Sequence, residues 1–336
     1  MEEKIKIYLP QNVYQILKKD MELFEFFKKD HTLNKNDFLN KLIVNYYESF
    51  AENSSKTYDY IKDVFDSLGI TEIDGNNAII DIMDFIAKQN FDKEGQKKDV
   101  VISMKPTKLS SRAFEYIENF LLKGYSLSGW LRNLLTSYVT LSQDKREQII
   151  FKENFDLIAE ALKKNRMIFF SMNSENKVRH IVSPYIIATS KEELFNYLLA
   201  QESGNPYSFR ISRIQNITIM NKECNLKNEV INVFEKMKQF GPQFSYALDE
   251  NKPIKVRLTE RGKMMYEKMY LHRPSYSLIE GDIYTFECSV NQAIQYFQRF
   301  GKHAVIIEPA EVRNTFEAYY KMAYNAYHKE SMLNKK

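Results

Sequence analysis

The sequence has very little cysteine, and what it has is badly placed for crosslinking or metal binding. Only two of the 336 residues are cysteines, Cys224 and Cys288, and they lie far apart. Two distant cysteines cannot form a disulfide framework or a closely spaced zinc knuckle. The five histidines form no paired metal spacing either. We therefore expect a protein of the reducing cytoplasm that carries no metal or other cofactor.

Long apolar runs are also missing, as are the short motifs of common enzymes. No uninterrupted apolar segment approaches the roughly 18 residues that span a bilayer, and the amino terminus has no signal-peptide core, so we expect no membrane partner. There is no glycine-rich phosphate loop, no serine elbow and no evident carboxylate pair. An enzyme would have to assemble its site entirely from distant residues, and we therefore expect a non-catalytic protein.

The composition is that of a folded protein. Hydrophobic residues make up 44% and charged residues 27% of the chain, whereas disorder needs low hydrophobicity and a large net charge. A chain of 336 residues predicts two to four domains. The net charge of +4 neither requires nor excludes a polyanionic partner, because only a concentrated positive surface would attract one.

The amino-terminal third contains a repeat. Residues 4–9 alternate polar and apolar, which predicts a strand, and a helix is expected after Pro10. Asn34 is placed to cap a second helix, and Ser126 takes the same position in a second copy over residues 100–140. The strands align best at an offset of 95 residues. The apolar positions of the two second helices match at an offset of 92: Phe38, Leu39, Leu42, Ile43, Tyr46 and Tyr47 with Trp130, Leu131, Leu134, Leu135, Tyr138 and Val139.

One strand and two helices cannot bury their own apolar face, but two copies can pair their strands and interlock their helices. Residues 4–50 and 99–141 resemble the ribbon-helix-helix fold of bacterial DNA-binding repressors. That resemblance implies a ribbon whose outward side chains contact nucleic acid. By position these are Lys4, Lys6 and Tyr8 in the first copy, and Val101, Ser103 and Lys105 in the second. Alternatively, the module only assembles the protein.

The segment between the two copies is expected to be a helical insert at about residues 51–96. Its apolar residues predict two packing helices, the first with Ile61, Val64, Phe65 and Leu68 before Gly69, the second with Ile79, Ile80, Met83 and Ile86. The polar residues 91–98 predict a linker.

The middle of the chain changes to short strands and tight turns, which predict a small barrel. Its segments Val182-Ser183-Pro184-Tyr185, Asn196-Tyr197-Leu198 and Phe209 to Ile214 resemble the WYL domain, an Sm-like, SH3-type barrel of bacterial regulators and CRISPR-associated proteins. The match spans roughly residues 165–222, with Asn196 where the family name has tryptophan. The resemblance implies a basic, partly aromatic pocket for nucleic acid or a nucleotide-like ligand, formed here by Arg179, His180, Tyr197, Arg210 and Arg213.

These residue types suit such a ligand. Guanidinium groups hold phosphate through paired hydrogen bonds and stack on bases, and a tyrosine supplies a flat face. Taken singly, each arginine is more often a solvated or ion-paired strand residue, and His180 is more often structural than a ligand. Their combination in one barrel favours binding.

The last third alternates strands and helices in a ferredoxin-like order. Phe300-Gly301 and the segment Ile306 to Arg313 resemble the extension that follows WYL domains, and this resemblance implies a homodimer. We therefore predict an α+β, multidomain chain: a tandem ribbon-helix-helix module over 1–145, a WYL domain with a leading helix over 146–222, and a dimerising ferredoxin-like extension over 223–336.

This order of domains is similar to that of the WYL accessory proteins encoded beside type VI-D RNA-targeting CRISPR effectors. The resemblance implies a cytoplasmic homodimer in antiviral defence that binds single-stranded RNA and enhances an RNA-guided CRISPR nuclease. The alternative is a ligand-responsive transcriptional regulator that binds DNA through its ribbon and uses the WYL domain as sensor, because that architecture is the same. A pure scaffold between protein partners is the third possibility.

Overall fold

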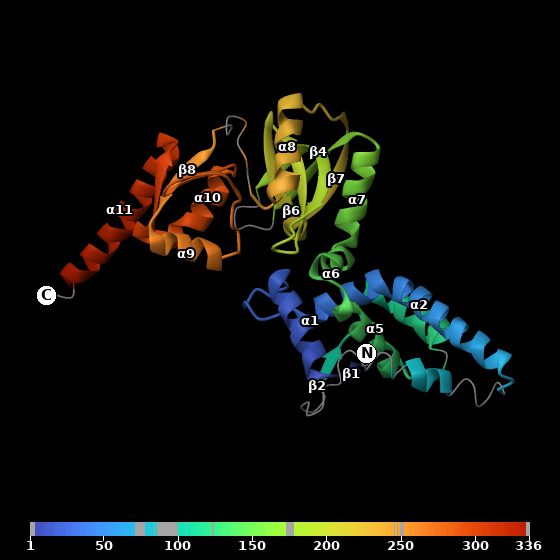
Figure 1. The fold of residues 1–336 in the computed structure, drawn as a ribbon. Helices are drawn as coiled ribbons and strands as arrows, with labels where there is room; N and C mark the ends of the chain where they lie inside the picture. Colours follow the sequence, from blue (N-terminus) through green and yellow to red (C-terminus); the bar gives the residue numbers. More distant parts are fainter. Residues whose placement is uncertain are drawn as a thin grey trace. The chain divides into compact units, whose positions relative to one another are not determined.

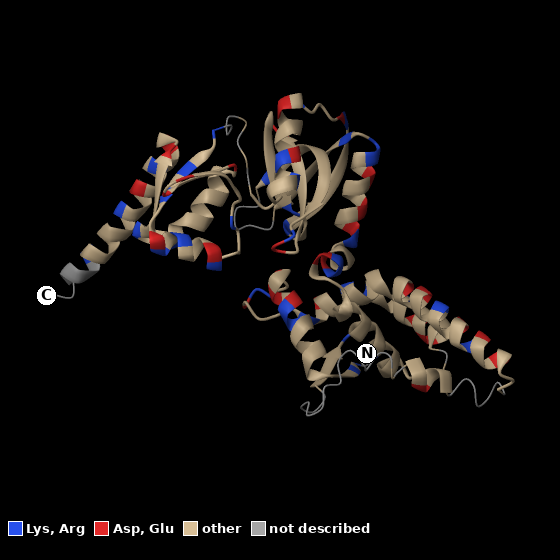
Figure 2. Ribbon diagram, viewed as in Figure 1, with Lys and Arg blue, Asp and Glu red and all other residues tan. Residues whose placement is uncertain are grey.

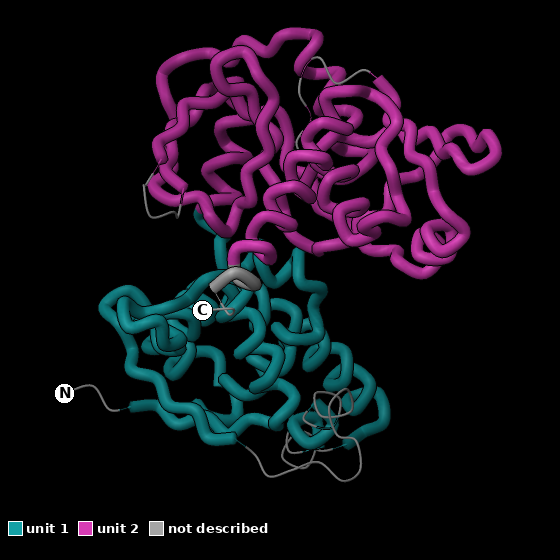
Figure 3. The backbone as a smooth tube through the Cα atoms, turned by 90° about the vertical axis from the view of Figure 1, so that its left-hand side faces the viewer, with its two compact units in different colours: residues 1–153 teal, residues 154–336 magenta. Residues whose placement is uncertain are grey.

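The structure is a computed structural model of the full chain, and it divides into two compact units, Met1–Glu153 and Asn154–Lys336 (Figures 1 and 3). It describes residues 4–70, 78–83, 85, 100–122, 124–172, 178–244, 246, 248 and 252–333. The predicted linker 91–98 and residue Ile86 of the insert lie outside these residues. The described chain is mixed α+β, with three separate sheets. None of its described helices is both long and apolar enough to cross a bilayer.

Unit 1 is built on a two-stranded antiparallel ribbon. β1 (Ile5–Leu9) pairs with β2 (Val100–Met104), and Ile7 lies opposite Ile102 at the centre. This register is the one that relates the two strands by the offset of 95 residues seen in the sequence. The helices that follow the strands are α1 (Gln11–Leu23), α2 (Lys35–Ser67), α4 (Lys108–Tyr116), the π-helix η1 (Ile117–Leu121), α5 (Leu127–Thr140) and α6 (Gln143–Ile150).

Side chains along the two ribbon strands point alternately into unit 1 and to solvent. Ile7, Leu9, Ile102 and Met104 point into the unit and are at most 7% exposed. The apolar faces of α2 and α5 complete this core, and their six matched positions are buried except at Tyr47, which is half-buried. The predicted caps are confirmed: the side chain of Asn34 accepts from the amide of Asp37, and that of Ser126 accepts from the amide of Gly129.

α2 is longer than the helix predicted from the sequence. The second helix of the first copy and the first helix of the insert form one helix of 33 residues, because residues 35–67 contain neither proline nor glycine to interrupt them. Its last turns pack less than predicted: Val64 is 40% exposed and Leu68 is 69% exposed. Ile79, in the helical segment 78–83, is buried as expected.

A charged pair lies in the core of unit 1. The Arg146 guanidinium donates to both carboxylate oxygens of Asp20, at 2.7 and 2.9 Å, and Asp20 is completely buried. The Tyr138 hydroxyl also donates to Asp20, at 2.9 Å. Burial, then the adjacent Asp20 carboxylate, raises the pKa of Tyr138 well above its usual value. This network joins α1, α5 and α6.

Unit 2 begins within α7 (Lys152–Lys163) and continues into a five-stranded antiparallel sheet. Among the described residues the strand order is β6-β5-β4-β3-β7, which places β6 and β7 at the edges. Side chains of α7 pack with one face of this sheet, and side chains of α8 (Asn228–Phe240) pack with Leu199 on the other. The strands are β3 (Arg166–Met172), β4 (Arg179–Thr189), β5 (Asn196–Glu202), β6 (Asn205–Arg210) and β7 (Ile214–Glu223), with the 3₁₀ turn η2 (Ile211–Arg213) before β7.

The rest of unit 2 is a four-stranded antiparallel sheet with helices. Its strand order is β11-β8-β10-β9, and its core combines aromatic residues of α9 and α10 with the buried faces of β8 and β11. The elements run β8 (Ile254–Leu258), α9 (Glu260–Lys268), β9 (Tyr276–Glu280), β10 (Ile283–Phe286), α10 (Val290–Phe297), the 3₁₀ segment η3 (Gln298–His303), β11 (Ala304–Glu308) and α11 (Ala310–Leu333).

Candidate nucleic-acid interface

The outward side of the ribbon carries the side chains that the sequence singled out. Lys6 lies opposite Ser103 and Tyr8 lies opposite Val101, and all four point to solvent because their neighbours along each strand are buried. Tyr8 is 45% exposed and Val101 is 51% exposed. We call these four residues the ribbon face. Lys4 and Lys105, at the strand ends, are exposed as well.

A basic hollow opens beside the ribbon face, and Ser103 belongs to both. It encloses about 710 Å³ between α1, the following loop and the start of α2. Among the described residues, three lysines, Lys18, Lys28 and Lys35, line it together with His31 and one acidic residue, Glu22. Figure 2 shows lysine or arginine on α1 and in the loop before α2. The net charge of the chain does not show this local concentration of positive charge.

Local hydrogen bonds fix the hollow against the ribbon. Lys35 at the start of α2 donates to the Tyr14 hydroxyl at 2.7 Å and lies over the same ring. The side chain of Asn36 accepts from the backbone amide of Lys105 at 2.7 Å. Lys18 lies 3.7 Å from Glu22 on an exposed surface, an ion pair of little strength. The start of α2 and the end of β2 are therefore held together.

The two copies of the repeat differ in surface chemistry. Lys6 of the first strand corresponds to Val101 of the second, and Tyr8 corresponds to Ser103. At the start of the second helix, Lys35 corresponds to Leu127. The ribbon is thus two-fold symmetric in its backbone pairing, whereas within the ribbon face only the first copy carries a lysine, Lys6.

In unit 2, the structure brings Tyr197 and Arg210 together. They are directly opposite each other on β5 and β6. The Arg210 guanidinium lies 3.3 Å from the centre of the Phe195 ring and donates to the Ser212 hydroxyl at 2.8 Å. Tyr197 is only 9% exposed, and its hydroxyl donates to Glu193. Both side chains belong to a packed network, and the ring of Tyr197 does not offer an open face to a base.

His180 lies elsewhere in the same sheet. Its ring packs against Phe170 and Phe209, with centroids 5.3 and 4.9 Å apart, on the face of the sheet that packs with α7. Its Nδ1 is 2.9 Å from a carboxylate oxygen of Glu202. Tyr197 and Glu202 are at opposite ends of β5, five residues or about 17 Å apart. His180 therefore does not meet Tyr197 or Arg210.

Arg179 and Arg213 form a third location. Both are exposed. Arg179 pairs with Ser171, and Ser171 in turn pairs with Gln215, two residues beyond Arg213, so the two arginines reach the same end of the sheet. The expectation that all five residues share one concave surface is thus not met. Adjacent strand residues such as Arg179 and His180 project to opposite faces, and a grouping by sequence motif does not take this into account.

The lysines of the basic hollow were missed in the sequence. Their signal was present in the pairs Lys18-Lys19 and Lys28-Lys29, and in Lys35 next to the predicted cap Asn34. Each pair alone resembles an ordinary solvated helix or loop end. Only the packing of α1 against the start of α2 brings Lys18, Lys28 and Lys35 to one place.

In the part of the chain that the structure describes, no three side chains of histidine, cysteine, aspartate or glutamate gather at one point. The two cysteines are half-buried thiols, and burial raises the pKa of Cys224.

Comparison with known proteins finds a fold relative that covers nearly the whole chain. No family model matches the sequence, and no curated protein matches it. The proteasome accessory factor PafBC of Arthrobacter aurescens is 14% identical over 80% of this chain and 46% of its own, with a TM-score of only 0.24, which supports no argument. A crystal structure described as a CRISPR Cas-related protein aligns with a TM-score of 0.68 and 23% identity, over 98% of this chain and 95% of that one. The chain therefore shares its fold with that CRISPR Cas-related protein.

Proposed function

We propose that this protein is a non-catalytic accessory protein that binds single-stranded RNA and enhances an RNA-targeting CRISPR nuclease. Its fold is shared from end to end with a protein described as CRISPR Cas-related. The element order supports the finer interpretation of a tandem ribbon-helix-helix module, a WYL-type Sm-like barrel and a ferredoxin-like extension. Our proposal includes a homodimer formed through this extension. On this interpretation the protein acts in the cytoplasm.

The basic hollow beside the ribbon face carries the proposal. Lys18, Lys28 and Lys35 supply positive charge for phosphates, and Tyr8 supplies an exposed ring on which a base can stack. A single strand presents phosphates and unstacked bases together, and a protein that offers both partners side by side can hold it. Arg179 and Arg213 form a second exposed cationic location in unit 2.

Binding of operator DNA is the second candidate, favoured by the antiparallel ribbon with helices behind it. Proteins of that kind read palindromic half-sites with two equivalent halves of a dimer. Here the two halves are not equivalent, because Lys6 is matched by Val101 and Lys35 by Leu127. A one-sided basic surface is better suited to a strand with direction than to a palindrome, and we therefore place RNA first.

The test is filter binding at fixed salt, comparing a single-stranded RNA with a DNA duplex of the same sequence. We expect the RNA to bind more tightly, and Lys28→Ala with Lys35→Ala to weaken it at least tenfold. The matched control is Lys302→Ala with Lys321→Ala, which removes the same charge from exposed positions of unit 2. Preference for the duplex, lost in a Lys4→Ala, Lys6→Ala variant, would establish the DNA-binding alternative. No salt-sensitive affinity for either would leave a protein scaffold.

The accessory role needs a separate assay. RNA cleavage by the partner nuclease is measured with and without this protein. We expect the protein to raise the rate and the Lys28→Ala, Lys35→Ala variant to lose that effect in proportion to its RNA affinity. Cleavage by the protein alone would contradict the non-catalytic proposal.

A further inference from the structure

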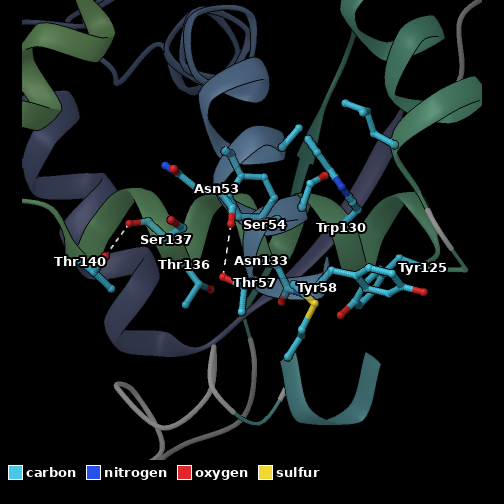
Figure 4. A pocket seen from close by; sticks show the side chains of 15 residues that line it. Asn53, Ser54, Thr57, Tyr58, Tyr125, Trp130, Asn133, Thr136, Ser137 and Thr140 are labelled. Atoms are coloured by element: carbon cyan, nitrogen blue, oxygen red, sulfur yellow. Dashed lines mark hydrogen bonds between the residues drawn. The ribbon is translucent and has the colours of Figure 1, made fainter. Parts of the chain in front are cut away.

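Unit 1 contains a second cavity, whose lining shares no residue with the basic hollow. We call it the helical pocket. It encloses about 280 Å³, and its fifteen lining residues come from the middle of α2, one face of α5, the segment before α5 and the short helical segment 78–83 (Figure 4). Ligand pockets in proteins begin at about 300 Å³, so this volume suits a small ligand.

The lining of the helical pocket combines buried aromatic rings with neutral polar groups. Phe50 and Trp130 meet edge to face, with centroids 5.1 Å apart, and both are buried. Ten of the fifteen residues carry a hydroxyl or an amide, and none of these described lining residues is charged. Hydroxyl-bearing side chains of α2 and α5 come close together in Figure 4. Such a lining favours an uncharged, flat ligand that also makes hydrogen bonds.

The hydroxyl groups are poised to bond such a ligand. Thr57 donates to the carbonyl of Asn53 at 3.3 Å, and Thr140 donates to that of Ser137 at 2.7 Å, so both oxygens retain lone pairs that accept. Thr136 is only 6% exposed, and its side chain makes no hydrogen bond with any residue that the structure describes. Because Thr136 lines the pocket, its hydroxyl can form a hydrogen bond with a ligand there.

We propose that the helical pocket binds a nucleobase, presented either by a free nucleoside or by one extruded base of an RNA strand. The ring would contact Trp130 and Phe50, and the base's N–H groups would donate to threonine oxygens. An anionic ring is disfavoured, because none of the described residues that line the pocket is a cation able to offset desolvation of its charge. Binding of an extruded RNA base rests on the proposed RNA-binding function, whereas binding of a free nucleoside in the pocket does not.

The position of the pocket connects it to the ribbon face. α5 carries Trp130 and Thr136 of the pocket, and from the same helix Arg132 donates to the backbone carbonyl of Tyr8 at 2.6 Å. A ligand that restricts the motion of α5 would therefore also restrict the position of Tyr8.

The test uses the only tryptophan of the chain, Trp130, as a fluorescent reporter inside the pocket. The full-length protein is titrated with adenosine, uridine and orotate, an anionic pyrimidine. We expect a saturable fluorescence change with at least one nucleoside and at least tenfold weaker binding of orotate. Thr136→Val should weaken nucleoside binding at least threefold, and Ser54→Phe should abolish it. Ser67→Phe, on an exposed turn of the same helix, is the control. Circular dichroism shows whether each variant is folded.

A short oligoadenylate distinguishes the two sources of the base. Displacement of adenosine by the oligomer identifies a strand as the source, whereas an oligomer without effect identifies a free nucleoside. The pocket proposal is overturned if adenosine, uridine and oligoadenylate all fail to change the fluorescence, if orotate binds equally well, or if folded Ser54→Phe binds as the unaltered protein does. Failure of the proposed RNA function would appear instead as unchanged RNA affinity in the Lys28→Ala, Lys35→Ala variant.

Discussion

Removing the lysines of the ribbon face and basic hollow should change the salt dependence of RNA binding in a calculable way. We consider Lys6→Ala, Lys28→Ala and Lys35→Ala together. If each lysine neutralises one phosphate, each contributes about 0.7 to the slope of log affinity against log salt for a single strand. The triple variant should therefore have a slope smaller by about 2, with an affinity deficit about twenty times larger at 50 mM than at 200 mM salt.

Filter binding over a series of salt concentrations measures this slope directly. The control variant with Lys302→Ala and Lys321→Ala removes charge from exposed positions outside the interface and should keep the original slope. Parallel lines for the triple variant and the unaltered protein would refute the reasoning, whatever the absolute affinities, because they would show that these lysines release no counterions.

Three further predictions concern the core and unit 2. Arg146→Met should lower the free energy of unfolding of unit 1 by about 3–5 kcal/mol, because it leaves the buried Asp20 carboxylate without its cation. The double variant with Asp20→Leu should recover most of that loss. Urea unfolding followed by Trp130 fluorescence measures the stability of both variants, and equal losses in the single and double variants would contradict the prediction. Arg179→Ala with Arg213→Ala should lower the slope of log RNA affinity against log salt by about 1.4. Tyr197→Phe should leave RNA affinity within twofold, because the ring of Tyr197 is buried. A large effect of Tyr197→Phe would instead support one pocket that contains all five predicted residues. Burial raises the pKa of Tyr266 to about 12, so the native state holds the phenol proton more tightly than the unfolded state does, and the free energy of unfolding should fall between pH 10 and 12. Tyr266→Phe should flatten this part of the plot of stability against pH. An unchanged plot would contradict the prediction.

Local periodicity was sufficient to predict much of unit 1. Alternation over residues 4–9 set the buried and exposed sides of β1, and a side chain able to cap a helix preceded α2. Both signals depend on nearest neighbours in the chain, so a sequence can carry them alone. The same reasoning divides α2 between the first copy, which ends at residue 50, and the helical insert that follows it.

Contacts between distant segments were beyond the sequence. Asp20 and Arg146 are 126 positions apart, and nothing in either neighbourhood indicates that they form a buried pair. The acidic partners of His180 and Tyr197 were missed for the same reason, although Glu193 lies only four residues before Tyr197. A family motif predicts which residues matter, but the strand register decides which of them meet.

The asymmetry of the ribbon bears most directly on function. Fusing two strand-helix-helix copies into one chain removes the constraint that both copies keep the same surface. Here the backbone pairing is symmetric, but Val101 and Leu127 occupy in the second copy the positions that Lys6 and Lys35 occupy in the first. A homodimer of single copies cannot differ in this way, because each substitution appears on both sides of its axis. The tandem arrangement thus permits a binding surface with a direction, which a nucleic acid strand has and a palindrome lacks. Replacing Val101 and Leu127 by lysine would make the two copies alike in charge at these two positions. We expect that variant to gain affinity for duplex DNA more than for single-stranded RNA, and equal gains would show that the asymmetry does not determine the choice between them.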